Sequence, residues 1–182
     1  TPPPPAETAS ESAGATSYPL VIHMHGRLGD GISEEKHTNM TDLAEREGFI
    51  VAYPDGVDRS WHDKRESGPA AEKNVDDVAF IRALIDKMIT EHSADPKRVY
   101  VAGISNGGFM TMRLACELSE KIAAVATFIA TMPENGAEQC KPTHPMPIAM
   151  FLGTEDPLVP YGGGDIHGKV LSADATRDRW AT

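Results

Sequence analysis

One segment near the middle of the chain reads Val99-Tyr100-Val101-Ala102-Gly103-Ile104-Ser105-Asn106-Gly107. An apolar run is followed by a G-x-S-x-G pattern, and a helix-like stretch comes next. In this setting a serine lies on a sharp, strained turn that lifts its Oγ above the end of a sheet, and the flanking glycines avoid clashes with the backbone. The pattern predicts that Ser105 is a nucleophile. The alternative is a glycine-rich turn with a capping serine.

Around this segment, strand-like and helix-like stretches alternate, which is typical of a parallel sheet with helices on both faces. The fold class is therefore α/β. Apolar residues recur at helical spacing from Val78 to Ile89 and again from Phe109 to Leu118. The expected strands are 19–25, 49–53, 99–102, 123–129 and 148–152, and the expected helices are 41–48, 75–92, one after Ser105, and 172–180. The Asp95-Pro96 pair is expected to break the chain before the central strand.

A nucleophilic serine needs an imidazole to take its proton and a carboxylate to orient that imidazole. Asp156 is our candidate acid, because it lies in the loop that follows the expected strand 148–152. An ordinary Asp-Pro turn is the alternative, and Glu155 and Asp165 compete for the role. Only 26 residues (182 minus 156) follow Asp156. We therefore expect the fold to lack its last strand and the loop that supplies a catalytic histidine.

His167 is the one histidine after Asp156, in a glycine-rich loop, and it is the candidate base. A solvent-exposed loop histidine is the reading we favour over a base. His62 is expected on the substrate side of the cleft, and His25 ends a strand, so both are weaker candidates for the base.

Stabilisation of the reaction's oxyanion needs two backbone N–H donors. One comes from the residue after the nucleophile, here Asn106, and the other from a loop after an earlier strand. The segment from His25 to Gly31 contains three glycines at the end of the first expected strand, and Arg27 is our second donor. The alternative is a plain glycine-rich turn between a strand and a helix.

Composition limits the classes of partner. A chain of 182 residues with 40% hydrophobic content suits one domain, assigned to residues 18–182, preceded by a flexible Pro-rich arm at 1–17. The net charge of −10 argues against nucleic-acid or anionic-membrane partners and favours a neutral or soluble ester substrate. No apolar window suits membrane insertion.

The arm suggests an exported protein, secreted or periplasmic, whose signal has been removed; a cytosolic tail is the alternative. Cys116 and Cys140 can form a disulfide, and two buried free thiols are equally compatible with the sequence.

Six collinear segments resemble the secreted esterases grouped as polyhydroxybutyrate depolymerases and feruloyl esterases, which have the α/β-hydrolase fold. The likeness extends over about residues 18–182. The segments are His25-Gly26, residues 47–56, Ser60-Trp61-His62-Asp63, residues 74–78, residues 98–108, and Gly153-Thr154 with Asp156-Pro157.

The resemblance implies that Ser105 is the nucleophile and Asp156 the acid, acting on short-chain, hydroxyalkanoate or feruloyl-type esters without a cofactor. The family continues through a further strand to its catalytic histidine, and this chain stops first, so we expect a C-terminal truncation. His62 replaces a family asparagine, and Arg27 stands where a small residue or cysteine is usual.

Other readings remain open at this stage. His23 and His25 have the spacing of metal ligands on one strand face, but no third ligand accompanies them, and we expect no metal. A hydrolase fold without its base can also act as an ester- or glycan-binding protein. Trp61 is expected to line the acyl pocket or to be a half-buried packing residue.

Overall fold

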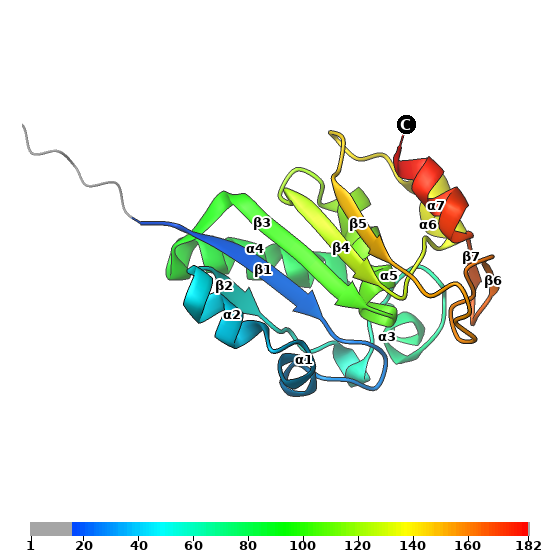
Figure 1. Ribbon diagram of the computed structural model, residues 1–182, viewed down its shortest axis with the longest axis horizontal. Helices are drawn as coiled ribbons and strands as arrows, with labels where there is room; N and C mark the ends of the chain where they lie inside the picture. The colour runs from blue at the N-terminus through cyan, green and yellow to red at the C-terminus, as the bar shows by residue number, and fades with distance from the viewer. Residues whose placement is uncertain (1–15, 182) are drawn as a thin grey trace, which may run out of the picture.

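Five parallel strands form one sheet in the order β2-β1-β3-β4-β5 in the computed structural model, which describes residues 16–181 (Figure 1). The strands are β1 (Tyr18–Met24), β2 (Ile50–Ala52), β3 (Ala94–Ile104), β4 (Ala124–Phe128) and β5 (Ile148–Phe151). The arm expected at 1–17 lies outside the described residues, except for Thr16 and Ser17.

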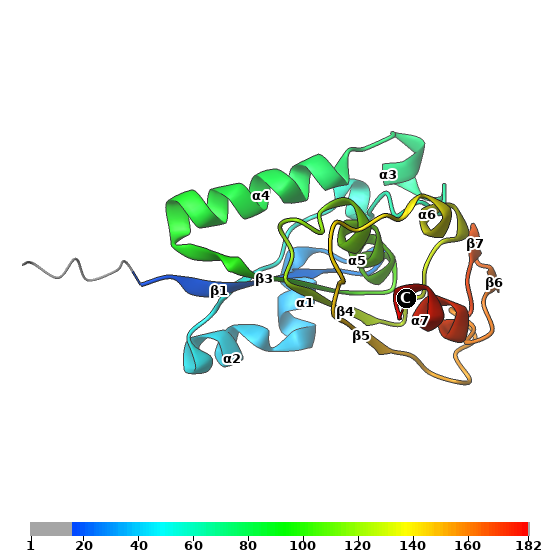
Figure 2. The same cartoon turned by 90° about the horizontal axis from the view of Figure 1, so that it is seen from above.

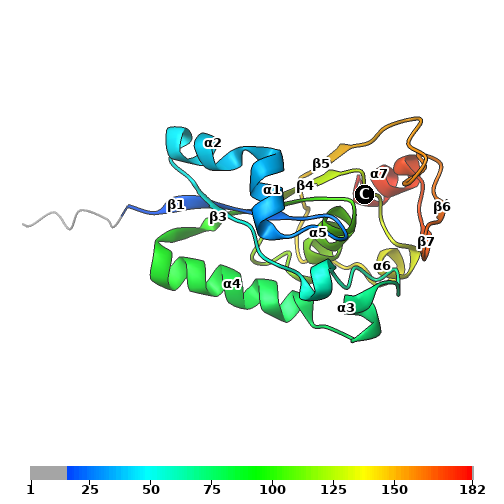
Figure 3. The same ribbon diagram turned by 90° about the horizontal axis from the view of Figure 1, so that it is seen from below.

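Helices cover both faces of the sheet. Figures 2 and 3 show α1 (Gly31–Thr38) and α2 (Met40–Glu47) on one face, and α4 (Asp77–His92) on the other. The remaining elements are η1 (Val57–Arg59), α3 (Pro69–Glu72), α5 (Asn106–Glu117), α6 (Glu134–Gln139), β6 (Gly164–Asp165), β7 (Lys169–Val170) and α7 (Ala173–Trp180). Within residues 16–181, none of these helices has the length and apolar character needed to span a bilayer.

The main core lies between the sheet and helices α4 and α5. Alternate residues of β1, Leu20, Ile22 and Met24, point into it and are fully buried. Ile81 and Ile85, one helical turn apart on α4, meet them from the other side. This packing fixes the central strands, at whose carboxyl ends the expected site residues lie.

The helix boundaries follow their capping residues. Asp76 accepts a hydrogen bond from the N–H of Ala79 at 3.0 Å and starts α4, and Gly48, with φ of 74°, ends α2. Helix α1 was not expected from the sequence, although Asp30 and Ser33 form a reciprocal capping box at its start.

The expected break at Asp95-Pro96 is wrong in position, because β3 already begins at Ala94 and includes both residues. The pairing of β1 with β3 shifts register between Tyr18 and Leu20, so the proline is accommodated as an irregularity in the ladder. The central strand is consequently longer than the apolar run that predicted it.

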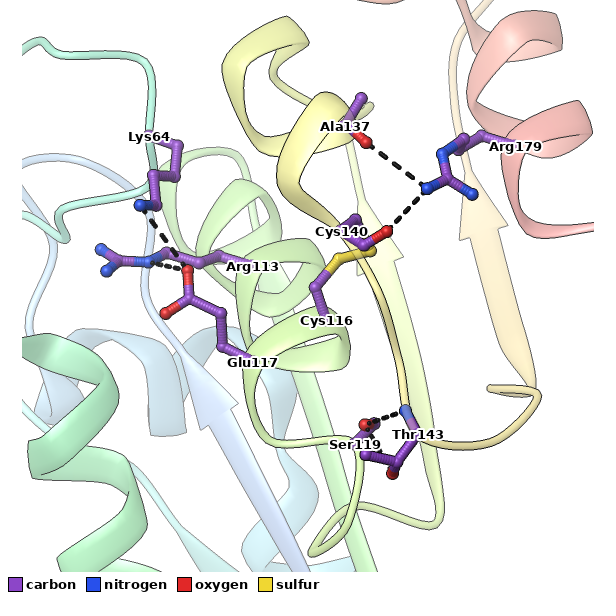
Figure 4. Close-up of a disulfide and its surroundings, with 9 residues drawn as sticks. All are labelled: Lys64, Arg113, Cys116, Glu117, Ser119, Ala137, Cys140, Thr143 and Arg179. Atoms are coloured by element: carbon purple, nitrogen blue, oxygen red, sulfur yellow. Dashed lines mark hydrogen bonds and ion pairs between the residues drawn. A yellow bond between two sulfur atoms is a disulfide. The ribbon is translucent and has the colours of Figure 1, made fainter.

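Cys116 and Cys140 form a disulfide that joins α5 to the residue after α6 (Figure 4). The guanidinium of Arg179, on α7, donates to the carbonyl oxygen of Cys140 at 2.7 Å. The disulfide thus links α5 to the end of α6, and the hydrogen bond from Arg179 connects α7 to the same residue. Of the two states that the sequence allowed, the paired one is found.

Candidate active site

Ser105 lies between β3 and α5 with φ of 52° and ψ of −119°. A non-glycine residue in this region stores strain of about 1–3 kcal/mol. Its N–H donates to the carbonyl oxygen of Phe128, at the end of β4, at 2.9 Å. A side chain at Gly107 would overlap the carbonyl oxygens of Met24 and His25, so the first turn of α5 can approach β1 only with glycine there. The G-x-S-x-G pattern therefore forms the sharp strand-turn-helix bend that the sequence predicts.

A cavity of about 1030 Å³ opens beside Ser105. Gly26 and Arg27 line it near the serine, and Phe128 and Phe151 are among the residues of its apolar wall. These two phenylalanine rings stack with centroids 4.8 Å apart. A polar part of the lining comes from His23, Glu34 and His37, among other residues.

The loop after β1 passes beside the serine at Gly26. The carbonyl oxygen of Gly26 accepts hydrogen bonds from Nδ1 of His25 at 2.8 Å and from the N–H of Gly29 at 3.0 Å. In a trans peptide the next N–H, that of Arg27, points the opposite way. A Cβ placed on Gly26 would lie 3.6 Å from Cβ of Ser105, so this peptide is next to the nucleophile.

Asn106 is the first residue of α5, where N–H groups have no partner inside the helix. Its side chain is buried and fully engaged. Oδ1 accepts from the N–H of Trp61 at 2.8 Å, and Nδ2 donates to the carbonyl of Trp61 at 3.0 Å and to Oδ2 of Asp63 at 2.6 Å. These bonds hold Asn106 firmly at the start of α5, directly after Ser105.

Trp61 and His62 do not occupy the substrate-contacting positions expected of them. Trp61 is 0% exposed and is absent from the described lining of the cavity, because its ring packs against His25 with centroids 4.9 Å apart. His62 is also buried: Nδ1 contacts the carbonyl of Val75 at 3.2 Å, and its own carbonyl accepts from Arg113. Both side chains have structural partners.

Asp156 lies in the loop after β5 and is partly buried. Its Oδ1 accepts the N–H groups of Leu158 at 2.8 Å and Val159 at 2.9 Å. These two bonds fix the carboxylate and leave Oδ2 without a partner among the described residues. Of the competing acids, Glu155 is exposed, and Asp165 caps the β6–β7 turn through the N–H of Gly168 at 3.1 Å.

No histidine among residues 16–181 forms a hydrogen bond with Oγ of Ser105. His167 is exposed in the turn between β6 and β7, and no contact joins it to Ser105 or Asp156 in the described part of the chain. His25 is fully buried, with Nε2 accepting from the N–H of Gly56 at 3.0 Å. His23 lies 3.0 Å from Glu34. The described residues contain no group of three side chains that could ligate a metal.

One carboxyl beside this network has a shifted pKa. Asp77, at the start of α4, is almost fully buried, and burial raises the pKa of its carboxyl above the usual value. The N–H of His62, which donates to Oδ2 at 2.7 Å, opposes that shift. Asp77 thus holds His62, the residue after Trp61, which pairs with the side chain of Asn106.

The sequence matches the family model of esterase PHB depolymerases over residues 7–135, which include the serine bend. The chain belongs to the esterase PHB depolymerase family. The structure has the α/β-hydrolase fold of its neighbours: a thermostable esterase aligns with a TM-score of 0.64 at 21% identity, over 90% of this chain and 48% of that one.

Two curated relatives are similar in sequence. A feruloyl esterase B of Piromyces equi is 35% identical over 83% of this chain and 28% of its own length. A bifunctional acetylxylan esterase/xylanase of Neocallimastix patriciarum is 32% identical over 81% of this chain and 20% of its own length. The chain thus spans less than a third of each of these relatives.

Proposed function

We propose that this family member is a serine carboxylic ester hydrolase, or the nucleophile-bearing part of one, within a domain of residues 18–182. The observation that supports it most strongly is the conformation of Ser105, which is strained, lies at the carboxyl end of the central strand and faces a cavity. Strain of this kind is retained where a side chain must be presented in one geometry.

In the proposed reaction, Oγ of Ser105 attacks the ester carbonyl and loses its proton to a base, and the carbonyl oxygen becomes an oxyanion. The N–H groups of Arg27 and Asn106 donate to that oxyanion. The tetrahedral intermediate then expels the alcohol, which takes up a proton, and leaves an acyl-enzyme that water hydrolyses. Asp156, whose Oδ2 has no partner in the described part of the chain, would orient the base.

The proposed substrates are short-chain, hydroxyalkanoate or feruloyl-type esters. The apolar wall formed by Phe128 and Phe151 suits an acyl group of low polarity. Names of relatives include a feruloyl esterase and a poly(3-hydroxyalkanoate) depolymerase, the latter from Paucimonas lemoignei. We also propose export from the cytosol, which the disulfide supports.

Covalent labelling tests the proposal. A fluorophosphonate is expected to modify the protein on Ser105, located by peptide mass spectrometry, and Ser105→Ala is expected to abolish labelling. Hydrolysis of p-nitrophenyl acetate should fall by ~10³-fold or more in the same variant. Labelling elsewhere, or equal turnover by wild type and variant, would refute the assignment.

A second candidate is an ester- or glycan-binding protein with little turnover, and the observation behind it is the cavity beside Ser105. His167→Ala tests whether His167 acts as the base or is only an exposed loop residue. A base contributes about 10²–10⁴-fold to rate. Because His167 is exposed and has no contact with Ser105 in the described part of the chain, we expect its replacement to leave the labelling rate unchanged. A fall of about 10²-fold or more would identify His167 as the base.

A further inference from the structure

The two backbone donors proposed for the oxyanion lie in different loops, 79 residues apart (106 minus 27). Arg27 follows β1, and Asn106 begins α5. Stabilisation of an oxyanion requires both N–H groups within about 2.7–3.1 Å of one oxygen position. Something must therefore fix the two loops relative to each other.

Trp61 contacts both loops. Its indole Nε1–H donates to the carbonyl of His25 at 3.0 Å, directly before the donor loop. Its backbone N–H and C=O pair with the side chain of Asn106 at 2.8 and 3.0 Å. One rigid, fully buried residue thus spans from the β1 loop to the oxyanion donor of α5.

The neighbours of Trp61 are themselves held. The His25 ring accepts from the N–H of Gly56 through Nε2 and contacts the Gly26 carbonyl through Nδ1, so the neutral ring carries its proton on Nδ1. Oδ2 of Asp63, which accepts from Asn106, also accepts two hydrogen bonds from the guanidinium of Arg65. In a buried site these bonds are not exchanged for water, so they define the loop geometry closely.

We propose that Trp61 is a positioning residue that sets the separation of the two oxyanion donors, an inference that rests on the proposed function. It acts through His25 on the peptide of Arg27 and through the Asn106 side chain on the first turn of α5. Trp61 itself does not touch substrate.

Trp61→Phe removes the indole N–H while keeping an aromatic ring and both backbone bonds to Asn106. Trp180→Phe is the matched control: its Nε1 is buried, has no hydrogen-bond partner among residues 16–181, and lies on α7. Circular dichroism and thermal unfolding first establish the folded fraction of each variant, so that rates are compared per folded molecule.

Fluorophosphonate labelling of Ser105 is the first readout. We expect the rate for Trp61→Phe to fall about tenfold below that of Trp180→Phe, less than the ~10²–10³-fold for losing a donor outright. With p-nitrophenyl acetate, kcat should fall while KM stays unchanged, because the bridge acts on the transition state. Equal rates for the two variants would overturn the inference.

Amide ¹H–¹⁵N spectra provide a second readout that needs no turnover. We expect the resonances of Arg27 and Asn106 to shift in Trp61→Phe and to stay in place in Trp180→Phe. Unmoved resonances would overturn the bridging role. If wild type is not labelled at Ser105, the proposed function fails, and the amide shifts still decide whether Trp61 holds the two loops together.

Discussion

At the scale of single residues, Ser105 shows the conflict between local stability and the proposed role. Glycine tolerates φ of 52° and ψ of −119° better than a residue with a Cβ. We predict that Ser105→Gly is more stable than Ser105→Ala by about 1 kcal/mol, although both lack the nucleophile. Urea unfolding of the two variants measures the difference. An equal or lower stability of the glycine variant would show that the backbone at position 105 is not strained.

Asp77 gives a prediction about pH. Because burial raises its folded pKa above the usual 3.8, the folded protein binds the proton more tightly than the unfolded chain. This residue's contribution to the free energy of unfolding therefore decreases as pH rises from 3.8 through the raised folded pKa, and it stays reduced above it. Asp77→Asn removes the ionisation. The free energy of unfolding of the variant, relative to that of wild type, should therefore increase as pH rises from about 3 to about 7.

Asp42→Asn is the matched control for that experiment, since Asp42 also lies in the first turn of a helix but is exposed. Urea unfolding across the pH range provides the free energies. A difference between Asp77→Asn and wild type that does not change with pH would show that the buried carboxyl does not titrate differently in the folded state.

At the scale of elements, the disulfide ties α5 to the segment after α6. Its two cysteines are separated by 24 residues, and closing a loop of this length stabilises a fold by about 3 kcal/mol. We predict that Cys116→Ala with Cys140→Ala lowers Tm by about 6–12 °C. Calorimetry of the double variant tests this, with wild type in reductant as its control; an unchanged Tm would mean that α6 is held by other contacts.

The elements near the serine were largely predictable, because local signals decide them. The apolar run of β3, the glycines around Ser105 and the cap at Asp76 each specify structure over a few neighbouring residues. Helix α1 has an equally local signal in the capping box of Asp30 and Ser33, so it too was predictable from the sequence, although it was not predicted. The short hairpin β6–β7 has only two residues per strand and no comparable pattern.

The role of Trp61 could not be predicted in the same way. Its partners Asn106 and His25 are 45 and 36 positions away, and no spacing rule relates them. A tryptophan near a glycine-rich catalytic pattern equally suits a substrate pocket and a buried contact. Only the fold, which brings the ends of β1 and β3 together, distinguishes these possibilities.

At the scale of the whole molecule, one face of the sheet remains open near the site. Phe128 and Phe151 line the cavity there, and Phe151 is 54% exposed. Within residues 16–181, no helix covers β5 on the side of α1 and α2 (Figure 3). An exposed apolar surface of this kind promotes association.

We predict that Phe151→Ser lowers the fluorescence of anilinonaphthalene sulfonate added to the protein, because the substitution removes exposed apolar surface from this face. Phe80→Ser is the control, since Phe80 is 43% exposed on α4, on the opposite face. Fluorescence titration of wild type and both variants measures the binding of the dye. An equal loss of dye fluorescence in both variants would mean that the dye does not prefer the face that carries Phe151.

The strand order also bears on how the chain is made. β1 and β2 can pair as soon as residue 52 has left the ribosome, but the other side of β1 pairs with β3, which begins 42 residues later (94 minus 52). At about 5–20 residues per second, that gap lasts roughly 2–8 s. During this time one side of β1 leaves its backbone N–H and C=O groups unpaired. The yield of folded protein in a cell should therefore depend on how well chaperones shield these groups.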